Sequence, residues 1–365
     1  MRGVLRRSLC VLLSLVGVAV VTELGLRRFL PFGDVLVEPD AELLFRARPG
    51  AGSVGIDVDG RWVVTRLNRV GLRGPELRAK SEDRLRIAVF GDSLVQATRT
   101  PRTQTFPARL AAECREIGVD VETLNAGVSG YGPDQSLLRF EAEVDELEPD
   151  LVLLVICAQN DVRDMLRNKL FQVNDEGELV RHRTGIPAEV SRRYEELTAR
   201  RAWPITARLV RGVLRGDTRP RRATRLPPAE LARRRPRGHA RFDADAQRQM
   251  TAILKRFRDG ARERDATFAL VVVPSSFDVV DGFVPDPSPV PAYDRRWTTD
   301  TFSAIAAQLE VPCLDLYDAL HAHQSADLFL PGDFHWSPAG QAFAAQHTSA
   351  FLVSSGLLDE PGESP

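Results

Sequence analysis

From about residue 84 onward, short apolar runs alternate with amphipathic segments, and this alternation restricts the possible folds more than any other feature of the sequence. Strand alternating with helix is typical of a parallel sheet whose two faces are covered by helices. The pattern predicts an α/β fold, a flavodoxin-like three-layer α/β/α sandwich with a central five-stranded parallel sheet. We expect strands at residues 85–90, 119–124, 151–156, 267–273 and 313–316, and helices at 105–117, 134–147 and 338–353.

The amino-terminal 30 residues have the character of a membrane segment. An apolar stretch at residues 8–26, interrupted only by Glu23, lies between basic residues: Arg2, Arg6 and Arg7 before it, Arg27 and Arg28 after it. This layout predicts one membrane-spanning helix, with the rest of the chain on the extracytoplasmic, periplasmic side of a bacterial cell membrane. No small-x-small cleavage site follows, which favours an uncleaved anchor over a signal peptide and a secreted product. A buried amino-terminal helix remains an alternative.

Composition excludes several classes of protein. Forty-nine Lys and Arg against fifty Asp and Glu give a net charge of -1, so no overall field points to nucleic acid as a partner. Four cysteines show no paired C-x-x-C spacing, and no metal or other cofactor is expected. Cys114, Cys157 and Cys313 lie in apolar runs, where cysteine usually acts as a small buried hydrophobe.

The chain divides into unequal parts around the predicted sheet. Residues 31–83 are punctuated by Gly and Pro and predict an extended, partly stranded lead-in that packs on the main domain at 84–355; a disordered tail follows at 356–365. An insertion at about 162–245 is rich in Arg and Pro, most densely at 211–241. It is either a flexible solvated segment, or a lid or basic surface that meets anionic lipid headgroups or acidic glycans.

Polar segments follow three of the predicted strands, and a fourth precedes the last helix. Because the carboxyl ends of parallel strands meet at one edge of a sheet, we expect these segments to lie together. Each alone is compatible with an ordinary turn or cap, but their number and order favour an active site. The segments are Gly91-Asp92-Ser93-Leu94, Asn125 to Gly130, Ala158-Gln159-Asn160-Asp161 and Asp333-Phe334-His335-Trp336.

The residue types in these segments suit acyl transfer to a serine. Ser93 can present a hydroxyl together with a backbone N–H, and the Asn160 amide can supply a further donor. His335 can accept the serine proton, while Asp333, two residues earlier, can hold the histidine tautomer. Asp134 and Asp161 are better explained as turn or capping residues.

The four segments resemble the sequence blocks of the SGNH (GDSL-like) hydrolase superfamily, over about residues 84–352 without the insertion. The resemblance implies a Ser93–Asp333–His335 triad, and an oxyanion hole made by the Ser93 N–H, the Gly130 N–H and the Asn160 side chain. Gly130 takes the glycine role because it stands five residues after Asn125. The lead-in stretch Asn68-Arg69-Val70-Gly71-Leu72-Arg73-Gly74 also resembles that of membrane-anchored bacterial members, where its role is not evident.

Two positions depart from the family pattern. Ala158 replaces the usual glycine of the third block, and Asp333 stands two rather than three residues before His335, with Gly332 at the usual place. Similar Asp-x-His spacing occurs in relatives that acetylate polysaccharides. The Gly-x-Ser-x-Gly elbow of α/β-hydrolases is absent, since Val95 holds its last position.

Three functions therefore stay open. The first is a serine esterase acting on acyl esters, in particular short-chain or O-acetyl esters of a glycan or lipid, through an acyl-enzyme. The second is an O-acyltransferase that modifies extracytoplasmic glycans. The third is a catalytically inactive glycan-binding or assembly protein that keeps the fold for its groove.

Overall fold

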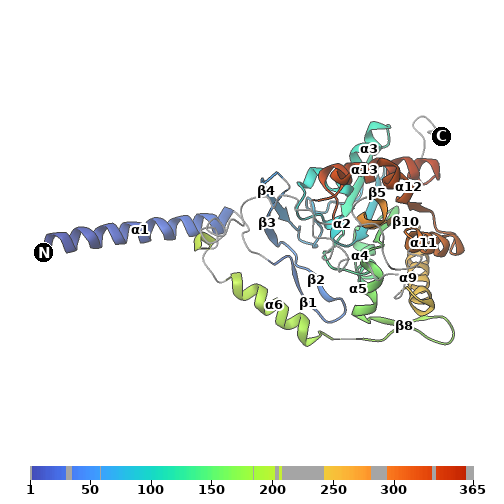
Figure 1. The fold of residues 1–365 in the computed structure, drawn as a ribbon, viewed down its shortest axis with the longest axis horizontal. Coiled ribbons are helices and arrows are strands. Elements are labelled where there is room, and N and C mark those ends of the chain that lie inside the picture. The colour runs from blue at the N-terminus through green and yellow to red at the C-terminus, as the bar shows by residue number, and fades with distance from the viewer. Residues whose placement is uncertain are drawn as a thin grey trace.

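The computed structural model describes residues 2–29, 35–57, 59–183, 185–201, 205–207, 242–280, 294–330 and 334–358. Within these ranges a long amino-terminal helix extends away from a three-layer α/β/α body, and small antiparallel hairpins lie against that body (Figure 1).

The central sheet has five parallel strands in the order β11-β10-β7-β5-β6. All seven residues of β7 are buried, as expected for a strand with both faces covered by helices. The strand order and the parallel pairing confirm the flavodoxin-like fold predicted from the sequence. The strands are β5 (Leu85–Gly91), β6 (Val121–Asn125), β7 (Leu151–Cys157), β10 (Thr267–Val273) and β11 (Cys313–Asp315).

Helices cover both faces of this sheet and divide the core into two apolar layers. Phe90 of β5 packs in one layer with Phe140 and Phe257, while Phe106 packs in the other with Trp336. Burying each such ring contributes about 1.5–3 kcal/mol. The first layer holds α4 (Pro133–Leu147), α9 (Ala244–Arg262) and α11 (Trp297–Gln308); the second holds α3 (Phe106–Glu116), α12 (Tyr317–His323) and α13 (Pro338–Ser354).

The remaining short elements lie around the sheet. These elements are the helices α2 (Ser93–Gln96) and α10 (Ser276–Val279), and the 3-10 turns η1 (Arg102–Gln104) and η2 (Ala326–Leu328).

Two of the cysteines lie in the core. Cys114 of α3 and Cys157 of β7 are buried, as expected for small apolar side chains.

The lead-in forms two hairpins that pack beside the carboxyl edge of the sheet. Its apolar residues Leu43, Ala47, Ala51 and Leu67 form a small core with Val128 and Tyr131, which belong to the loop after β6. The lead-in is therefore in direct contact with one of the predicted site segments. The hairpins are β1 (Val37–Asp40) with β2 (Leu44–Ala47), and β3 (Gly52–Ile56) with β4 (Trp62–Arg66).

The segment predicted as an insertion contains secondary structure in its described part. It holds α5 (Asp161–Asn168), the hairpin β8 (Phe171–Val173) with β9 (Leu179–Arg181), and α6 (Ala188–Arg201). The Arg- and Pro-rich stretch 211–241 lies outside the described residues.

The first helix, α1 (Arg2–Phe29), contains the span Arg6–Leu26, which is long and apolar enough to cross a membrane. A signal sequence at this end of a chain would have the same length and composition.

Candidate active site

Ser93 lies where the first strand of the sheet turns into a helix. β5 ends at Gly91, and Ser93 is the first residue of α2. Asp92 caps this helix, because its Oδ1 accepts a hydrogen bond from the Leu94 N–H at 2.8 Å. The turn fixes Ser93 at the carboxyl edge of the sheet, as the sequence predicts.

His335 comes to the same place from the far end of the chain. The turn that carries it is closed by a bridge between Phe329 and Trp336 and by a hydrogen bond from the Leu330 N–H to the His335 carbonyl at 2.7 Å. The neighbouring Trp336 is 1% exposed and packs on Phe106, which anchors the turn in the core. As a result, His335 Nε2 lies 2.7 Å from Ser93 Oγ across 242 positions of sequence.

Gln341 ties the histidine segment to the serine segment. Its side chain accepts a hydrogen bond from the Phe106 N–H and donates one to the Leu94 carbonyl at 3.1 Å. Ser337 caps α13 by accepting from the Gly340 N–H at 3.2 Å. Asp333, the predicted acid, lies outside the described residues.

The segment after β6 is tied to the serine turn by three groups of hydrogen bonds. Asn125 Nδ2 donates to the Val95 carbonyl at 2.8 Å, and the Val128 N–H donates to the Gly91 carbonyl at 3.0 Å. Ser129 donates through its N–H and its hydroxyl to Gln96 Oε1, at 3.1 and 2.6 Å. These bonds fix the position of the following residue, Gly130, relative to the turn that carries Ser93.

Gly130 adopts a backbone angle φ of 87°, a left-handed conformation that glycine tolerates best. Among the described residues, neither the Gly130 N–H nor the Ser93 N–H has a protein acceptor. Backbone donors in this state are available to an oxygen that gains negative charge.

Asn160 lies in a cluster of buried carboxyl groups near Ser93. Its Nδ2 donates to Asp92 Oδ2 at 3.1 Å, to Asp161 Oδ1 at 3.2 Å and to Asp164 Oδ2 at 3.0 Å. An amide has two hydrogens, so three acceptors compete for them. The Asn160 amide therefore has to exchange one carboxyl partner before it can donate to a substrate oxygen.

Burial shifts the pKa values of two of these carboxyl groups, those of Asp92 and Asp161, upward. Burial raises the pKa of Asp92, against the opposing effects of its hydrogen bonds from Leu94 and Asn160. Burial, with the nearby charge of Asp92, raises the pKa of Asp161 well above its ordinary value. A neutral carboxyl group places less negative charge near the Ser93 oxygen than an ionised one does.

Arg73 is a residue whose role the sequence did not reveal. It is 3% exposed, and its guanidinium donates to the carbonyls of Gln96 at 2.6 Å, Ala97 at 2.5 Å and Thr100 at 2.7 Å. Burial, together with Arg102, lowers its pKa to about 10, so it remains charged at neutral pH. The lead-in thus holds the loop that follows Ser93; the only signal was the stretch from Asn68 to Gly74.

Ser93 and His335 open onto a cavity of about 350 Å³. Its wall includes the loop held by Arg73 and the side chains of Ser129, Trp336 and Gln341. A hydroxyl hydrogen-bonded to an imidazole, beside unpaired backbone N–H groups, is suited to attack on a carbonyl carbon.

A parallel sheet with a serine after its first strand and a histidine before its last helix defines a class of three-layer α/β hydrolases. The model of the GDSL-like Lipase/Acylhydrolase family matches residues 89–269, and that of the SGNH hydrolase-like domain, acetyltransferase AlgX, matches residues 234–364. The chain belongs to the SGNH (GDSL-like) hydrolase superfamily.

Individual relatives are distant. An arylesterase from Vibrio mimicus is 27% identical over 130 residues, which cover 33% of this chain and 65% of the arylesterase, less than two thirds of its length. The structure of TesA shares 14% identity over 74% of this chain and 98% of its own, with a TM-score of 0.39. A lipase/acylhydrolase from Enterococcus faecalis shares 14% identity over 76% and 98%, with a TM-score of 0.40.

Proposed function

We propose that this protein is a serine esterase that cleaves acyl esters through an acyl-enzyme at Ser93. The hydrogen bond of 2.7 Å between His335 Nε2 and Ser93 Oγ is the observation that carries the proposal. In this mechanism His335 takes the hydroxyl proton while Ser93 Oγ attacks the ester carbonyl carbon. The bond to the alcohol breaks, and the alcohol leaves with the proton from His335.

Water completes the cycle by attacking the acyl-enzyme and giving its proton to His335, which releases the acid and restores Ser93. The Ser93 and Gly130 N–H groups and the Asn160 amide stabilise the oxyanion in both steps. Asp333 holds the His335 ring in the required tautomer. Short-chain and O-acetyl esters are the expected acyl substrates.

The place of the reaction follows from α1. We infer that α1 is a single-pass anchor, that residues 31–83 form a lead-in, and that the hydrolase domain at 84–355 lies on the periplasmic side. The apolar span Arg6–Leu26 supports the anchor.

The experiment is labelling and turnover by purified full-length protein. Ser93→Ala should lose reaction with a fluorophosphonate probe and turnover of p-nitrophenyl acetate, and His335→Ala should lose both nearly as completely. Ser275→Ala is the control, because Ser275 is another buried serine at this edge of the sheet, donating to Gln159 Oε1 at 3.0 Å. Wild-type turnover by Ser93→Ala would end the proposal.

A second candidate is an O-acyltransferase that passes the acyl group to a glycan hydroxyl. The match of residues 234–364 to an acetyltransferase domain model favours it. The two reactions share every step up to the acyl-enzyme and differ in what attacks it. Acetyl transfer to added oligosaccharides, faster than release of free acetate, would select the transferase.

A further inference from the structure

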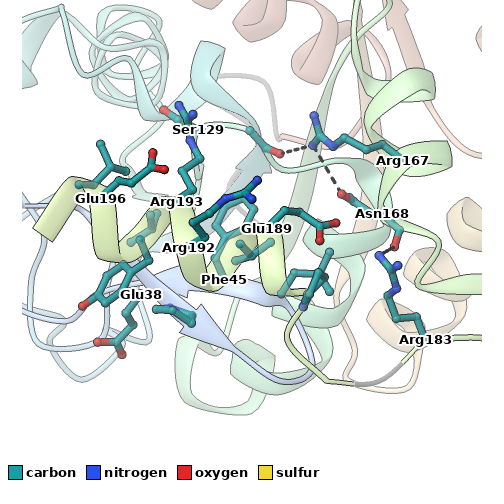
Figure 2. A pocket seen from close by; sticks show the side chains of 18 residues that line it. Glu38, Phe45, Ser129, Arg167, Asn168, Arg183, Glu189, Arg192, Arg193 and Glu196 are labelled. Atoms are coloured by element: carbon teal, nitrogen blue, oxygen red, sulfur yellow. Dashed lines mark hydrogen bonds between the residues drawn. The ribbon is translucent and has the colours of Figure 1, made fainter.

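A second and larger cavity, of about 670 Å³, shares the lining residue Ser129 with the cavity at Ser93 and His335, and Figure 2 shows its lining side chains. It lies between the hairpin β1–β2 and α6, and Ser129 and Gly130 also line it. Ser129 also lines the cavity that contains Ser93 and His335. Ser129 therefore borders both cavities, which places the second space next to the one that contains Ser93.

Apolar side chains form one wall of the larger cavity. Most are only half-buried, so their surface is accessible to a ligand. An accessible apolar wall of this kind binds hydrocarbon, at about 0.8 kcal/mol for each methylene group that it removes from water. The side chains are Val37, Pro39, Leu44, Phe45, Pro187, Val190, Tyr194 and Leu197.

Four arginines line the same cavity. Arg167 donates to Asp164 Oδ1 at 2.9 Å and Arg183 to the Asn168 carbonyl at 3.3 Å. Arg192 and Arg193 are exposed, and neither has a hydrogen-bond or ion-pair partner in the part of the chain that the structure describes. Figure 2 shows both extending from α6 on the side that faces Ser129 and Arg167.

The acidic residues of the wall leave this positive charge in excess. Glu38, Glu189 and Glu196 also line the cavity, and Glu38 is paired with Arg46 at 2.8 Å. Unpaired guanidinium groups are suited to bind phosphate or carboxylate oxygens through two parallel hydrogen bonds.

The uncharged polar side chains argue against a sugar in this space. Among the lining residues, such groups are few: the side chains of Ser129 and Asn168 and the hydroxyl of Tyr194. A glycan presents many hydroxyls, each of which needs a partner when it is removed from water. An apolar wall beside free arginines instead matches an amphiphile with an anionic head.

The position of the cavity fits the same class of ligand. Glu23 of α1 accepts hydrogen bonds from the N–H groups of Ile205 and Thr206, at 2.9 and 3.0 Å. This contact joins the end of the apolar helix to the segment after α6. In Figure 1 α6 and the hairpin β1–β2 lie on the side of the body from which α1 leaves, so an anchored protein would hold the cavity near the lipid surface.

We propose that this cavity binds the non-reacting part of a lipid-like acyl ester, with the hydrocarbon on the apolar wall and an anionic phosphate headgroup on Arg192 and Arg193. The inference rests on the proposed esterase function and names its substrate class.

The test compares two esters with the same chain in full-length protein held in nanodiscs of zwitterionic lipid. The probes are 1-O-dodecyl-2-acetylglycerol 3-phosphate and the neutral 1-O-dodecyl-2-acetylglycerol, in which the acetyl ester reacts and the dodecyl chain belongs to the non-reacting part. The wild-type protein should have the higher kcat/KM for the phosphate ester. In Arg192→Gln/Arg193→Gln the ratio of the two kcat/KM values should fall about tenfold or more, mainly through KM.

A matched control removes the same charge elsewhere. Arg248 and Lys255 of α9 are exposed and do not line the cavity, so Arg248→Gln/Lys255→Gln should keep the wild-type ratio. A wild-type ratio near one, or an equal ratio in the Arg192/Arg193 variant, would overturn the inference. The inference would also be overturned if Arg192→Gln/Arg193→Gln raised the KM for an acetylated polyuronate and left the KM for the phosphate ester unchanged. The esterase proposal has a separate test: turnover of p-nitrophenyl acetate should be lost in Ser93→Ala whatever the result for the two lipid esters.

Discussion

Asn160 Nδ2 donates a hydrogen bond to Asp92 Oδ2 at 3.1 Å, and the same oxygen lies 3.5 Å from Ser93 Oγ. The residue proposed to stabilise the oxyanion is therefore held by the residue that caps the nucleophile helix. A buried carboxyl group close to Ser93 is compatible with a developing oxyanion when it is protonated, and burial raises the pKa of Asp92 in that direction.

We expect Asn160→Ala to lower kcat by about 10²–10³, because an oxyanion donor is lost. Stability should fall as well, since three carboxyl groups lose their amide partner. The measurements are kcat for p-nitrophenyl acetate and the midpoint of thermal unfolding.

Asn168→Ala is the control for this variant. Asn168 ends α5, the helix that begins directly after Asn160; it is buried and donates to Asp134 Oδ1 at 3.0 Å and Gln135 Oε1 at 2.7 Å. It should lose similar stability and keep most of its kcat. If both variants lose kcat in proportion to stability, Asn160 has no role beyond holding the carboxyl cluster.

Arg73→Met should lower kcat by about tenfold or more, because the Gln96–Thr100 loop beside Ser93 loses the cation that fixes three of its carbonyls. Arg73→Lys should recover part of the loss, since a lysine keeps the charge but not the fork of donors. Arg69→Met is the matched control in the same stretch, because Arg69 is exposed. Equal kcat in Arg73→Met and Arg69→Met would contradict the role given to Arg73.

Gly127→Ala should destabilise the protein by about 1–3 kcal/mol and impair the site. A Cβ at this position would lie 2.5 Å from the Gln96 nitrogen and 2.7 Å from Val95 Cβ, so the nucleophile turn would have to shift. Gly74→Ala is the control, because a Cβ there has no atom within 4 Å. Urea unfolding of both variants decides the matter; a Gly127→Ala protein as stable as Gly74→Ala would contradict the packing.

The sequence was sufficient to predict the sheet and the meeting of Ser93 with His335. Each strand is an apolar run bounded by turn residues, and parallel strands bring their carboxyl ends to one edge whatever the length of the connections. That rule places residues 242 positions apart in one site without any detail of packing. The motif blocks then indicate which polar residue of each segment to propose for the site.

The polar network beneath the site could not be predicted in the same way. Arg73 and Asn168 have side chains that, in a sequence, indicate a solvent-facing position as readily as a buried one. Their burial depends on partners supplied by other segments: the loop after α2 for Arg73, and the start of α4 for Asn168. Hydrogen bonds of this kind follow from the assembled fold and have no periodic pattern of their own.

The last prediction concerns pH and Asp134, in the first turn of α4. Burial raises the pKa of Asp134 from an ordinary value of 3.8 to about 7, although Asn168 donates to its Oδ1. The folded state therefore holds a proton that the unfolded state has released, and stability falls as pH rises from about 4 to about 8. The contribution of this group is at most about 4 kcal/mol.

Asp134→Asn removes the titration and keeps an oxygen that can accept from Asn168. Its stability should match the wild type at about pH 4 and exceed it at about pH 8, as measured by urea unfolding at both values. Asp145→Asn is the control: Asp145 is exposed, and its hydrogen bond with Arg264 lowers its pKa, so this variant should keep the wild-type fall in stability towards alkaline pH. An unchanged fall in Asp134→Asn would show that Asp134 is ionised in the folded protein, and that the Asn168 amide outweighs the cost of burying its charge.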